Sequence, residues 1–589
     1  MKASRRSLPF LVALWMIACV ASAAAATFRI TGVVLDSTTG NPVPNSHLDA
    51  SPLSQGRGFG TGFRGRGQNT VGTDTDAHGR FALELPSSGS WHLTASASGY
   101  VTQAYDAHGG YSSSVVLTPA TPSYDLQFRI APQGRVSGTV LDEAGEAVRN
   151  ANVQLFLQQI IDPSASSAEP AFTPRSFAQT DDRGAYEFAN LPPGSYRVFV
   201  QARPWYAAQA QQRQSLASRT QGAAPPTTEP SLDVIYESTW FPGVTDEAQA
   251  ETITMAPGDE GHADFQLTPV PALHLQIVVP AQSGEQNQRV GATFPIVERV
   301  DTNGPGRGFA QTTTTNSQGV IDVGGLAAGT YRISLQSQGN NSKPVLVQLT
   351  PGSSRVIDLR ETSSSMATIS VDEAGGGDED DDRGRFVSVE LIDTATGKRY
   401  SSSGGGRYMP PMIRGGGPQG MIPLEGPMRS GGDSTFQVPP GQYEVVTSSR
   451  GSSYVTGLTA VGAELNGRIL TVRSSDVKLT LHLATGRATV RGVASIGGKP
   501  CSGAAVLLVP AGLDDPRSFT TVARDQSNTD GSFDLEEVVP GQYILIAVDH
   551  GWNINWRDPS TMRRYLVRGV PLDVTHSQNL RQNIDAQAP

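Results

Sequence analysis

Apolar and polar residues alternate along much of this chain, and turn signals separate the short alternating runs. Val136, Gly138 and Val140 stand at every second position, and so do Tyr186 and Phe188. A period of two places one face of a β-strand toward a core. Short, regularly spaced strands between turn signals predict β-sandwiches and not parallel α/β units.

A ten-residue interval between two glycines recurs four times in nearly the same local sequence. An Asp or Asn stands three residues before the first glycine, and an aromatic residue follows two residues after the second. The intervals are 79–89, 184–194, 319–329 and 531–541, with Asp76, Asp181, Asn316 and Asn528 before them and Trp91, Tyr196, Tyr331 and Tyr543 after them. A repeat of fixed spacing predicts a chain of similar modules.

The repeat also predicts local structure. In the Asp/Asn-x-x-Gly turn the side chain is expected to accept backbone N–H groups, and the glycine to be left-handed. Gly40, Gly145 and Gly497 lie in turns of the first half of the repeat and are also expected to have positive φ. The ring after the second glycine is expected to pack inward and to place a hydroxyl on nearby backbone, as the corner tyrosines of sandwiches do.

We expect five modules, each of about 100 residues and able to form its own core. The predicted order is a signal peptide at 1–26 and modules at 27–132, 133–269, 270–361, 362–485 and 486–589. Module 2 carries an insertion at 201–232, with a short helix expected at 206–219. Module 3 shows the first half of the repeat weakly. Module 4 is divergent: Pro440-Gly441-Gln442-Tyr443 is present without an Asp-x-x-Gly turn, and acidic and glycine-rich loops interrupt it.

The order G-x-V-x-D, turn, D-x-x-G-x-aromatic and P-G-x-Y is similar to the carboxypeptidase regulatory-like domain. The resemblance covers modules 1, 2 and 5 well and module 3 in part. It implies a seven-stranded transthyretin-like sandwich, grouped with starch-binding-like folds, in an exported bacterial protein. Carbohydrate or protein binding is implied only loosely, because fold does not determine function. Five modules leave no length for the zinc peptidase domain that gives the family its name.

The first residues predict export to the periplasm, the outer membrane or the cell exterior. A positive start precedes an apolar stretch too short to span a bilayer, and Ala21-Ser22-Ala23 offers a cleavage site. Residues 16–19 loosely match a lipoprotein cleavage box, so membrane attachment is expected only if Cys19 carries a lipid anchor. If Cys19 is removed, Cys501 is the only cysteine and no intramolecular disulfide can form.

Charge and motif spacing argue against several kinds of chemistry. A net charge of −10 disfavours nucleic acid as a partner. The nine histidines lack the spacing of a zinc peptidase, and no Gly-x-Ser-x-Gly elbow occurs. Asp378, Asp380 and Asp382 could offer oxygens to calcium, but Arg383 and Val389 stand where a calcium loop needs Gly and Glu. A solvated loop is therefore favoured, and we expect no cofactor and no catalytic residues.

Aromatic residues that follow the last repeat strand are the leading candidates for ligand contact. The candidates are Trp205, Tyr206, Tyr236, Trp240 and Phe241 in module 2, and Trp552 and Trp556 in module 5; Tyr100, Tyr105 and Tyr111 gather similarly in module 1. Exposed rings stack on sugar faces. The alternative is that the rings cap their own cores or seal module junctions.

These observations predict an exported, non-enzymatic protein that binds carbohydrate or cell-envelope polysaccharide, with weak single sites strengthened by linkage. A structural or adhesive scaffold that binds envelope proteins is the alternative.

Overall fold

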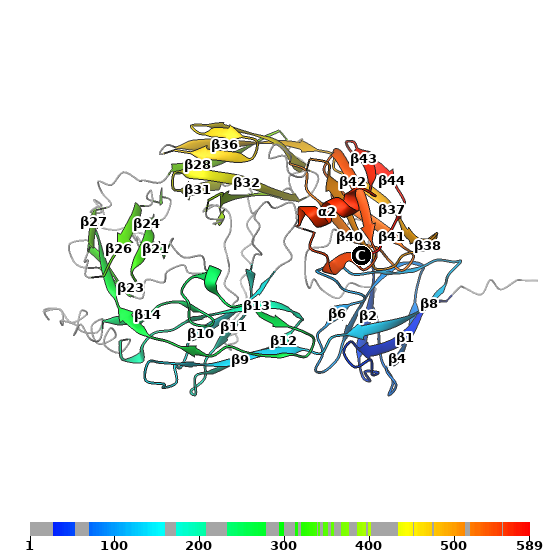
Figure 1. The fold of residues 1–589 in the computed structure, drawn as a ribbon, viewed down its shortest axis with the longest axis horizontal. Helices are drawn as coiled ribbons and strands as arrows, with labels where there is room; N and C mark the ends of the chain where they lie inside the picture. The colour runs from blue at the N-terminus through cyan, green and yellow to red at the C-terminus, as the bar shows by residue number, and fades with distance from the viewer. Residues whose placement is uncertain are drawn as a thin grey trace, which may run out of the picture.

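The computed structural model describes residues 27–53, 70–158, 172–207, 233–278, 294–299, 312–315, 320–337, 340–341, 345–351, 355–358, 367–375, 386–395, 399–401, 434–450, 453–473, 476–512, 519–556 and 558–589. Its regular structure is almost entirely β, and the sheets pair into five sandwiches (Figure 1). The predicted tandem array of β-sandwich modules is confirmed. The chain runs around a ring, so that the last sandwich lies beside the first.

Modules 1 and 2 each contain two facing sheets. In module 1 the sheets consist of β4 (Arg80–Leu85), β1 (Phe28–Asp36) and β8 (Ser123–Ile130), and of β3 (Val71–Asp74), β2 (His47–Pro52), β5 (Gly89–Ser96), β6 (Gln103–Ala104) and β7 (Val115–Leu117). In module 2 they consist of β12 (Ala185–Leu191), β9 (Gly134–Leu141), β17 (Glu260–His262) and β18 (Phe265–Gln266), and of β11 (Phe172–Gln179), β10 (Asn152–Gln158), β13 (Gly194–Gln201), β15 (Thr239–Trp240) and β16 (Ile253–Met255). A ribbon of β14 (Val234–Tyr236) and β19 (Pro269–Pro271) leads to module 3.

Modules 3 and 4 repeat this plan. The sheets of module 3 are β22 (Thr312–Thr315), β23 (Val320–Leu326), β20 (Leu273–Val278) and β27 (Arg355–Asp358), and β21 (Phe294–Arg299), β24 (Gly329–Ser337), β25 (Asn340–Asn341) and β26 (Val345–Leu349). Those of module 4 are β31 (Ser434–Val438), β28 (Ala367–Gly375), β36 (Val477–Thr485) and β33 (Ser453–Val461), and β30 (Arg399–Ser401), β29 (Phe386–Asp393), β32 (Gly441–Arg450), β35 (Ile469–Val472) and β34 (Glu464–Asn466).

Module 5 adds a helix to the same plan. Its sheets are β38 (Lys499–Pro500), β37 (Ala488–Ile496), β41 (Ser532–Val538), β44 (Asn579–Arg581) and β45 (Ile584–Asp585), and β40 (Ala523–Gln526), β39 (Ala505–Pro510), β42 (Gly541–Val548) and β43 (Val570–Val574). Between β42 and β43 lie the 3₁₀ turn η4 (Gly551–Asn553) and the helix α2 (Pro559–Leu566).

In every module the first strand occupies the centre of one sheet. It pairs antiparallel with a strand of the second half of the repeat and parallel with a strand near the module's end, as β1 does with β4 and β8. Module 4 follows the same rule, with β28 between β31 and β36. Module 4 therefore shares the arrangement of the others, although the Asp-x-x-Gly turn is absent from its sequence.

The parallel strand explains a glycine in the first strand of three modules. A Cβ on Gly138 would lie 2.1 Å from the carbonyl oxygen of Ala263, which belongs to the segment between β17 and β18. A Cβ on Gly32 would lie 2.1 Å from the carbonyl oxygen of Leu126, and a Cβ on Gly492 would lie 1.8 Å from that of Gln582. No side chain fits at such a distance, so glycine is required by the close approach of two backbones.

The rings that open the strand after the second glycine all behave as corner residues. Each is buried, and its polar atom donates to the carbonyl four residues earlier: Trp91 to Ser87 (3.3 Å), Tyr196 to Pro192 (2.5 Å), Tyr331 to Ala327 (2.9 Å), Tyr443 to Pro439 (2.6 Å) and Tyr543 to Val539 (2.6 Å). The prediction of an inward ring that ties down its own turn is confirmed in all five modules.

The Asp-x-x-Gly turns of modules 1 and 2 also form as predicted. Oδ1 of Asp181 accepts the N–H groups of Arg183 and Ala185, each at 2.8 Å, and Asp76 accepts two N–H groups at the same distance. Gly184 has a φ of 74°, in the left-handed region, and the expected positive φ is also found at Gly40, Gly145 and Gly497.

Polar contacts join neighbouring modules. Between modules 2 and 3, His274 lies between Asp322 and Asp233, at 3.2 and 2.9 Å. The hydrogen bond to Asp322 is the main cause that raises the pKa of His274 to about 9. Between modules 4 and 5, the Arg487 guanidinium donates to carbonyl oxygens on both sides, including those of Ser453 and Glu537.

Candidate functional site

Trp240 is the most deeply buried of the predicted ligand-binding rings. It packs against Phe199 and Phe156 on the outer face of the second sheet of module 2, with ring centroids 4.8 and 5.0 Å away, and is only 1% exposed. Phe241 packs inward on Phe265 at 6.0 Å. Stacking on a sugar requires an exposed ring face, which Trp240 does not offer; Phe241 is only partly buried.

Glu143 organises the two tyrosines among the candidates. Tyr206 donates to Oε1 of Glu143 at 2.8 Å, and Tyr236 donates to Oε2 at 3.0 Å. Burial is the main cause that raises the pKa of Tyr206 to about 12, and burial also raises the pKa of Tyr236. Both hydroxyls therefore act as neutral donors that hold residues 205–207 and β14 against module 2.

Trp205 differs from its neighbours because it is 60% exposed. Its indole meets Tyr206 edge to face, with centroids 5.8 Å apart. Residues 201–207 of the insertion are described, and 205–207 are helical; the remainder of the predicted helix, 208–219, lies outside the described residues. Trp205 is the one predicted ring that presents most of its surface to solvent in the part of the chain that the structure describes.

In module 5 the rings cover the outer face of the second sheet. Trp556 donates Nε1–H to the carbonyl of Gly551 at 3.0 Å and packs on Tyr565 of α2. With Met562 these rings cover apolar side chains of β39 and β42, so Trp556 is only 9% exposed. The segment between β42 and β43 therefore caps a sheet face.

Trp552 lies at the contact between modules 1 and 5. Its ring stacks on Tyr111 at 5.3 Å and on His108 at 5.9 Å, both from module 1. Trp552 also donates Nε1–H to the carbonyl of Gly503 at 3.0 Å. The same junction brings Arg524 over Tyr111 at 5.5 Å. The sequence left Trp552 as a candidate either for ligand contact or for sealing a module junction, and in the structure its ring lies at the junction of the first and last modules.

Backbone groups of β7 extend this contact. The N–H of Ser114 donates to Oδ1 of Asn528 at 2.9 Å, and its carbonyl accepts from the N–H of Thr529 at 3.1 Å. The N–H of Val116 donates to Oγ1 of Thr529 at 3.0 Å. Val115 pairs with Trp91 of β5, which lies on the other side of β7. The turn at 528–529 therefore covers the edge of β7 that does not pair with β5.

Gln526 supplies the buried polar centre of the contact. Its amide Nε2 lies 2.9 Å from Ser113 Oγ and 3.0 Å from Asp106 Oδ2, and its side-chain oxygen accepts from Nδ1 of His108 at 3.3 Å. Ser113 in turn donates to the carbonyl of Ser527 at 2.9 Å. Gln526 is 1% exposed. Buried polar groups that are fully paired give a contact specificity, because a mismatched partner leaves them unsatisfied.

We call this contact the clasp. Its module 1 face consists of Asp106, His108 and residues 111–116, and its module 5 face of Gly503, Arg524, residues 526–529 and Trp552. The residues that it joins are more than 400 positions apart in the sequence. The sequence did not single out this contact, because Asn528 and Asn316 occupy the same position of the repeat.

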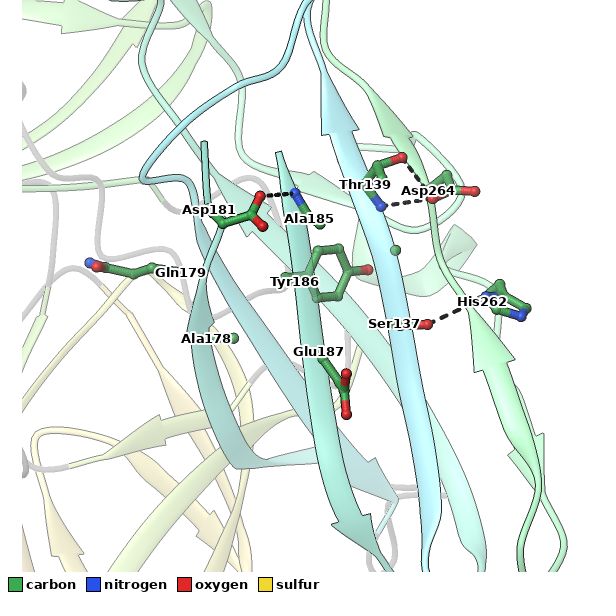
Figure 2. A pocket seen from close by; sticks show the side chains of 11 residues that line it. Ser137, Thr139, Ala178, Gln179, Asp181, Ala185, Tyr186, Glu187, His262 and Asp264 are labelled. Atoms are coloured by element: carbon green, nitrogen blue, oxygen red, sulfur yellow. Dashed lines mark hydrogen bonds between the residues drawn. The ribbon is translucent and has the colours of Figure 1, made fainter. Parts of the chain in front are cut away.

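Module 2 also has an open hollow of about 540 Å³ on its outer surface (Figure 2). Ser137 Oγ lies 3.4 Å from Nδ1 of His262 there. Asp264 lies nearby, but its Oδ1 accepts the N–H and the hydroxyl of Thr139, at 2.7 and 2.9 Å. A nucleophilic triad needs a carboxylate that orients the histidine. The Asp264 contact instead ties β9 to the module's last strand.

Several predictions fall on residues outside the described ranges. These are the acidic run with Asp378, Asp380 and Asp382, the glycine-rich loops, Cys19 and the segment 1–26. Within the described ranges, no group of three or more His, Cys, Asp or Glu side chains is placed to hold a metal ion. The helices described there are all too short or too polar to cross a membrane.

Several solved structures, among them pilins, align with this chain at low similarity. The TIE protein of Bacillus anthracis is 10% identical with a TM-score of 0.15, and the alignment covers 96% of this chain and 76% of that one. The minor pilin GBS52 of Streptococcus agalactiae is 10% identical with a TM-score of 0.20, covering 44% and 100%. A streptococcal ancillary pilin is 11% identical with a TM-score of 0.19, covering 56% and 98%. Similarity at this level says nothing of activity or partners.

A comparison with curated proteins found no match. A family model does match two segments, residues 29–130 and 135–224, which fall in modules 1 and 2. The matched segments contain the first-strand glycines, the capped Asp turns and the corner rings described above. The chain therefore contains two copies of the carboxypeptidase regulatory-like domain.

Proposed function

We propose that this chain is an exported, non-enzymatic scaffold whose sandwich modules associate with one another and bind envelope proteins. The clasp is the observation that supports this function most directly. Its paired buried polar groups and stacked rings join module 1 to module 5. Export is supported by the pattern of the first 26 residues.

Cross-linking in intact producing cells, followed by mass spectrometry, tests the scaffold. We expect links from the outer faces of the modules to a small set of envelope proteins, and mature chains that begin near residue 27. Links confined to cytosolic proteins would contradict the proposal. So would hydrolysis of peptide or glycoside substrates by the purified chain.

Carbohydrate binding remains a second candidate, supported by the exposed indole of Trp205. A single ring is a weak site unless linkage to other sites strengthens it. Affinity gels and glycan arrays with the wild-type chain and Trp205→Ala test this candidate. Retention that Trp205→Ala abolishes, and that Trp240→Phe leaves intact, would establish it. Retention that is absent, or equal in all three proteins, would remove it.

A further inference from the structure

The two faces of the clasp are different surfaces, and every copy of the chain carries both. The module 1 face offers the edge of β7 with Tyr111, and the module 5 face offers the turn at 528–529 with Trp552. A contact between unlike faces can close a ring or link one copy to the next. A sheet edge that accepts an external segment recognises it through its main chain, so the geometry does not require both faces to belong to one chain.

The joints around the ring differ in how firmly they are held. A buried cluster of Ile235, Ala272 and Ala327 joins modules 2 and 3. Phe519 of module 5 packs on the core of module 4, beside the Arg487 contacts. Between modules 3 and 4, Arg332 donates to the carbonyl of Gln437 at 3.2 Å. Among the described residues, no buried apolar cluster spans that boundary. The described residues therefore join modules 3 and 4 by polar contact without a shared apolar cluster, as they also join modules 1 and 2.

We propose that the clasp also joins two copies of this chain, with module 5 of one copy bound to module 1 of another. If the boundary between modules 3 and 4 opens, two chains can exchange modules 4 and 5 and form both clasps again. Within one chain the effective concentration of one face relative to the other is on the order of millimolar. The closed monomer is therefore favoured in dilute solution. Crowding of copies at one site shifts the balance toward the exchanged dimer. This inference goes beyond the proposed function and does not depend on it.

Two complementary full-length variants test the proposal, because each lacks one face. Gln526→Ala with Trp552→Ala removes the module 5 face. Asp106→Gly with Tyr111→Ala removes the module 1 face, and glycine suits position 106, where φ is 53°. Neither variant can close its own ring, but an equal mixture contains one intact face of each kind. Trp205→Ala is the matched control, since its ring is exposed and lies outside the clasp. Circular dichroism checks that each variant is folded.

Small-angle scattering and analytical ultracentrifugation provide the readouts. We expect each variant alone to be an expanded monomer, and the mixture to contain a one-to-one heterodimer that neither forms alone. Expanded chains that do not combine would overturn the proposal, as would self-association of either variant as strong as that of the mixture. Variants as compact as the wild type would show that these contacts do not hold the ring. If the first module 5 variant does not fold, Thr529→Val replaces it, since Thr529 lies outside every apolar cluster and only its bond to Val116 is lost.

Discussion

The glycine in the first strand of module 2 provides a sharp test of how the sandwich is built. In Gly138→Ala the new Cβ would lie 2.1 Å from the carbonyl oxygen of Ala263 and 2.9 Å from the hydroxyl of Tyr186. The carbonyl carbon of Ala263 would also lie 2.7 Å away, and a side-chain rotation cannot relieve a clash with backbone atoms. The segment between β17 and β18 that carries Ala263 must move away from β9, and the buried hydrogen bond from Tyr186 to Ala263 is then lost.

The expected cost follows from two contributions. Overpacking a well-packed site costs about 1–3 kcal/mol, and an unsatisfied buried donor or acceptor costs about 1–3 kcal/mol more. We therefore expect Gly138→Ala to lower the unfolding free energy of module 2 by about 4 kcal/mol, the middle of that range. Tyr186→Phe isolates the second contribution. Gly457→Ala in β33 is the control, because a Cβ there meets nothing within 4 Å.

Hydrogen exchange is measured at increasing urea concentration, and mass spectrometry of peptides from β9 and β17 gives the urea midpoint of unfolding for module 2 separately from the other modules. We expect a large fall in the midpoint for Gly138→Ala, a smaller one for Tyr186→Phe, and little change for Gly457→Ala in the peptides of β33. The two variants are compared by the change in urea midpoint at the substituted strand, β9 for Gly138→Ala and β33 for Gly457→Ala. A change at β9 that is no larger than the change at β33 would refute the close-approach argument.

Three further predictions follow from single side chains. Tyr543→Phe loses the 2.6 Å bond to the carbonyl of Val539 and should destabilise module 5 by about 1 kcal/mol, seen as faster exchange in β41 and β42. His274 has a folded-state pKa raised from 6.5 to about 9, so its contribution is complete below pH 6.5 and is lost as the pH rises through 9; the urea midpoint of module 3 should fall over that range, and His274→Gln should flatten the fall. Burial raises the pKa of the Cys501 thiol to about 12, so iodoacetamide should alkylate it slowly in the folded chain and quickly in urea, and rapid reaction in the folded chain would contradict its burial.

The parts of the fold that sequence predicted are those governed by local chemistry. Asp181 caps a turn within four residues, and Tyr543 bonds a carbonyl four residues away. Their signals are therefore complete within a short stretch of sequence. The close approach at Gly138 is different, because its cause is a strand more than a hundred residues later in the chain. The alternation of apolar residues predicted that Gly138 faces inward. Only the parallel pairing of the strands shows why no side chain fits there.

The placement of the aromatic residues was ambiguous in sequence for a similar reason. A ring that caps a sheet and a ring that awaits a ligand have the same composition and spacing. One signal could have separated them: every residue of β39 (AVLLVP) is buried, and a continuous apolar run indicates a strand covered on both faces. A sheet covered on both faces needs something to cover it, and Trp556 with α2 does so.

The clasp shows where a repeat reveals a binding surface. Modules 1 and 2 place Asp in the repeated turn, and Oδ1 of each carboxylate accepts two N–H groups of the turn itself. Asn528 donates to Ser532 with its amide and keeps its carbonyl for Ser114 of module 1, while Asp530 accepts the N–H of Ser532 in its place. A carboxylate could not both donate and accept in this way. The same repeat position therefore serves only its own turn in modules 1 and 2, whereas in module 5 it also binds another module, because an amide offers a donor and an acceptor at once.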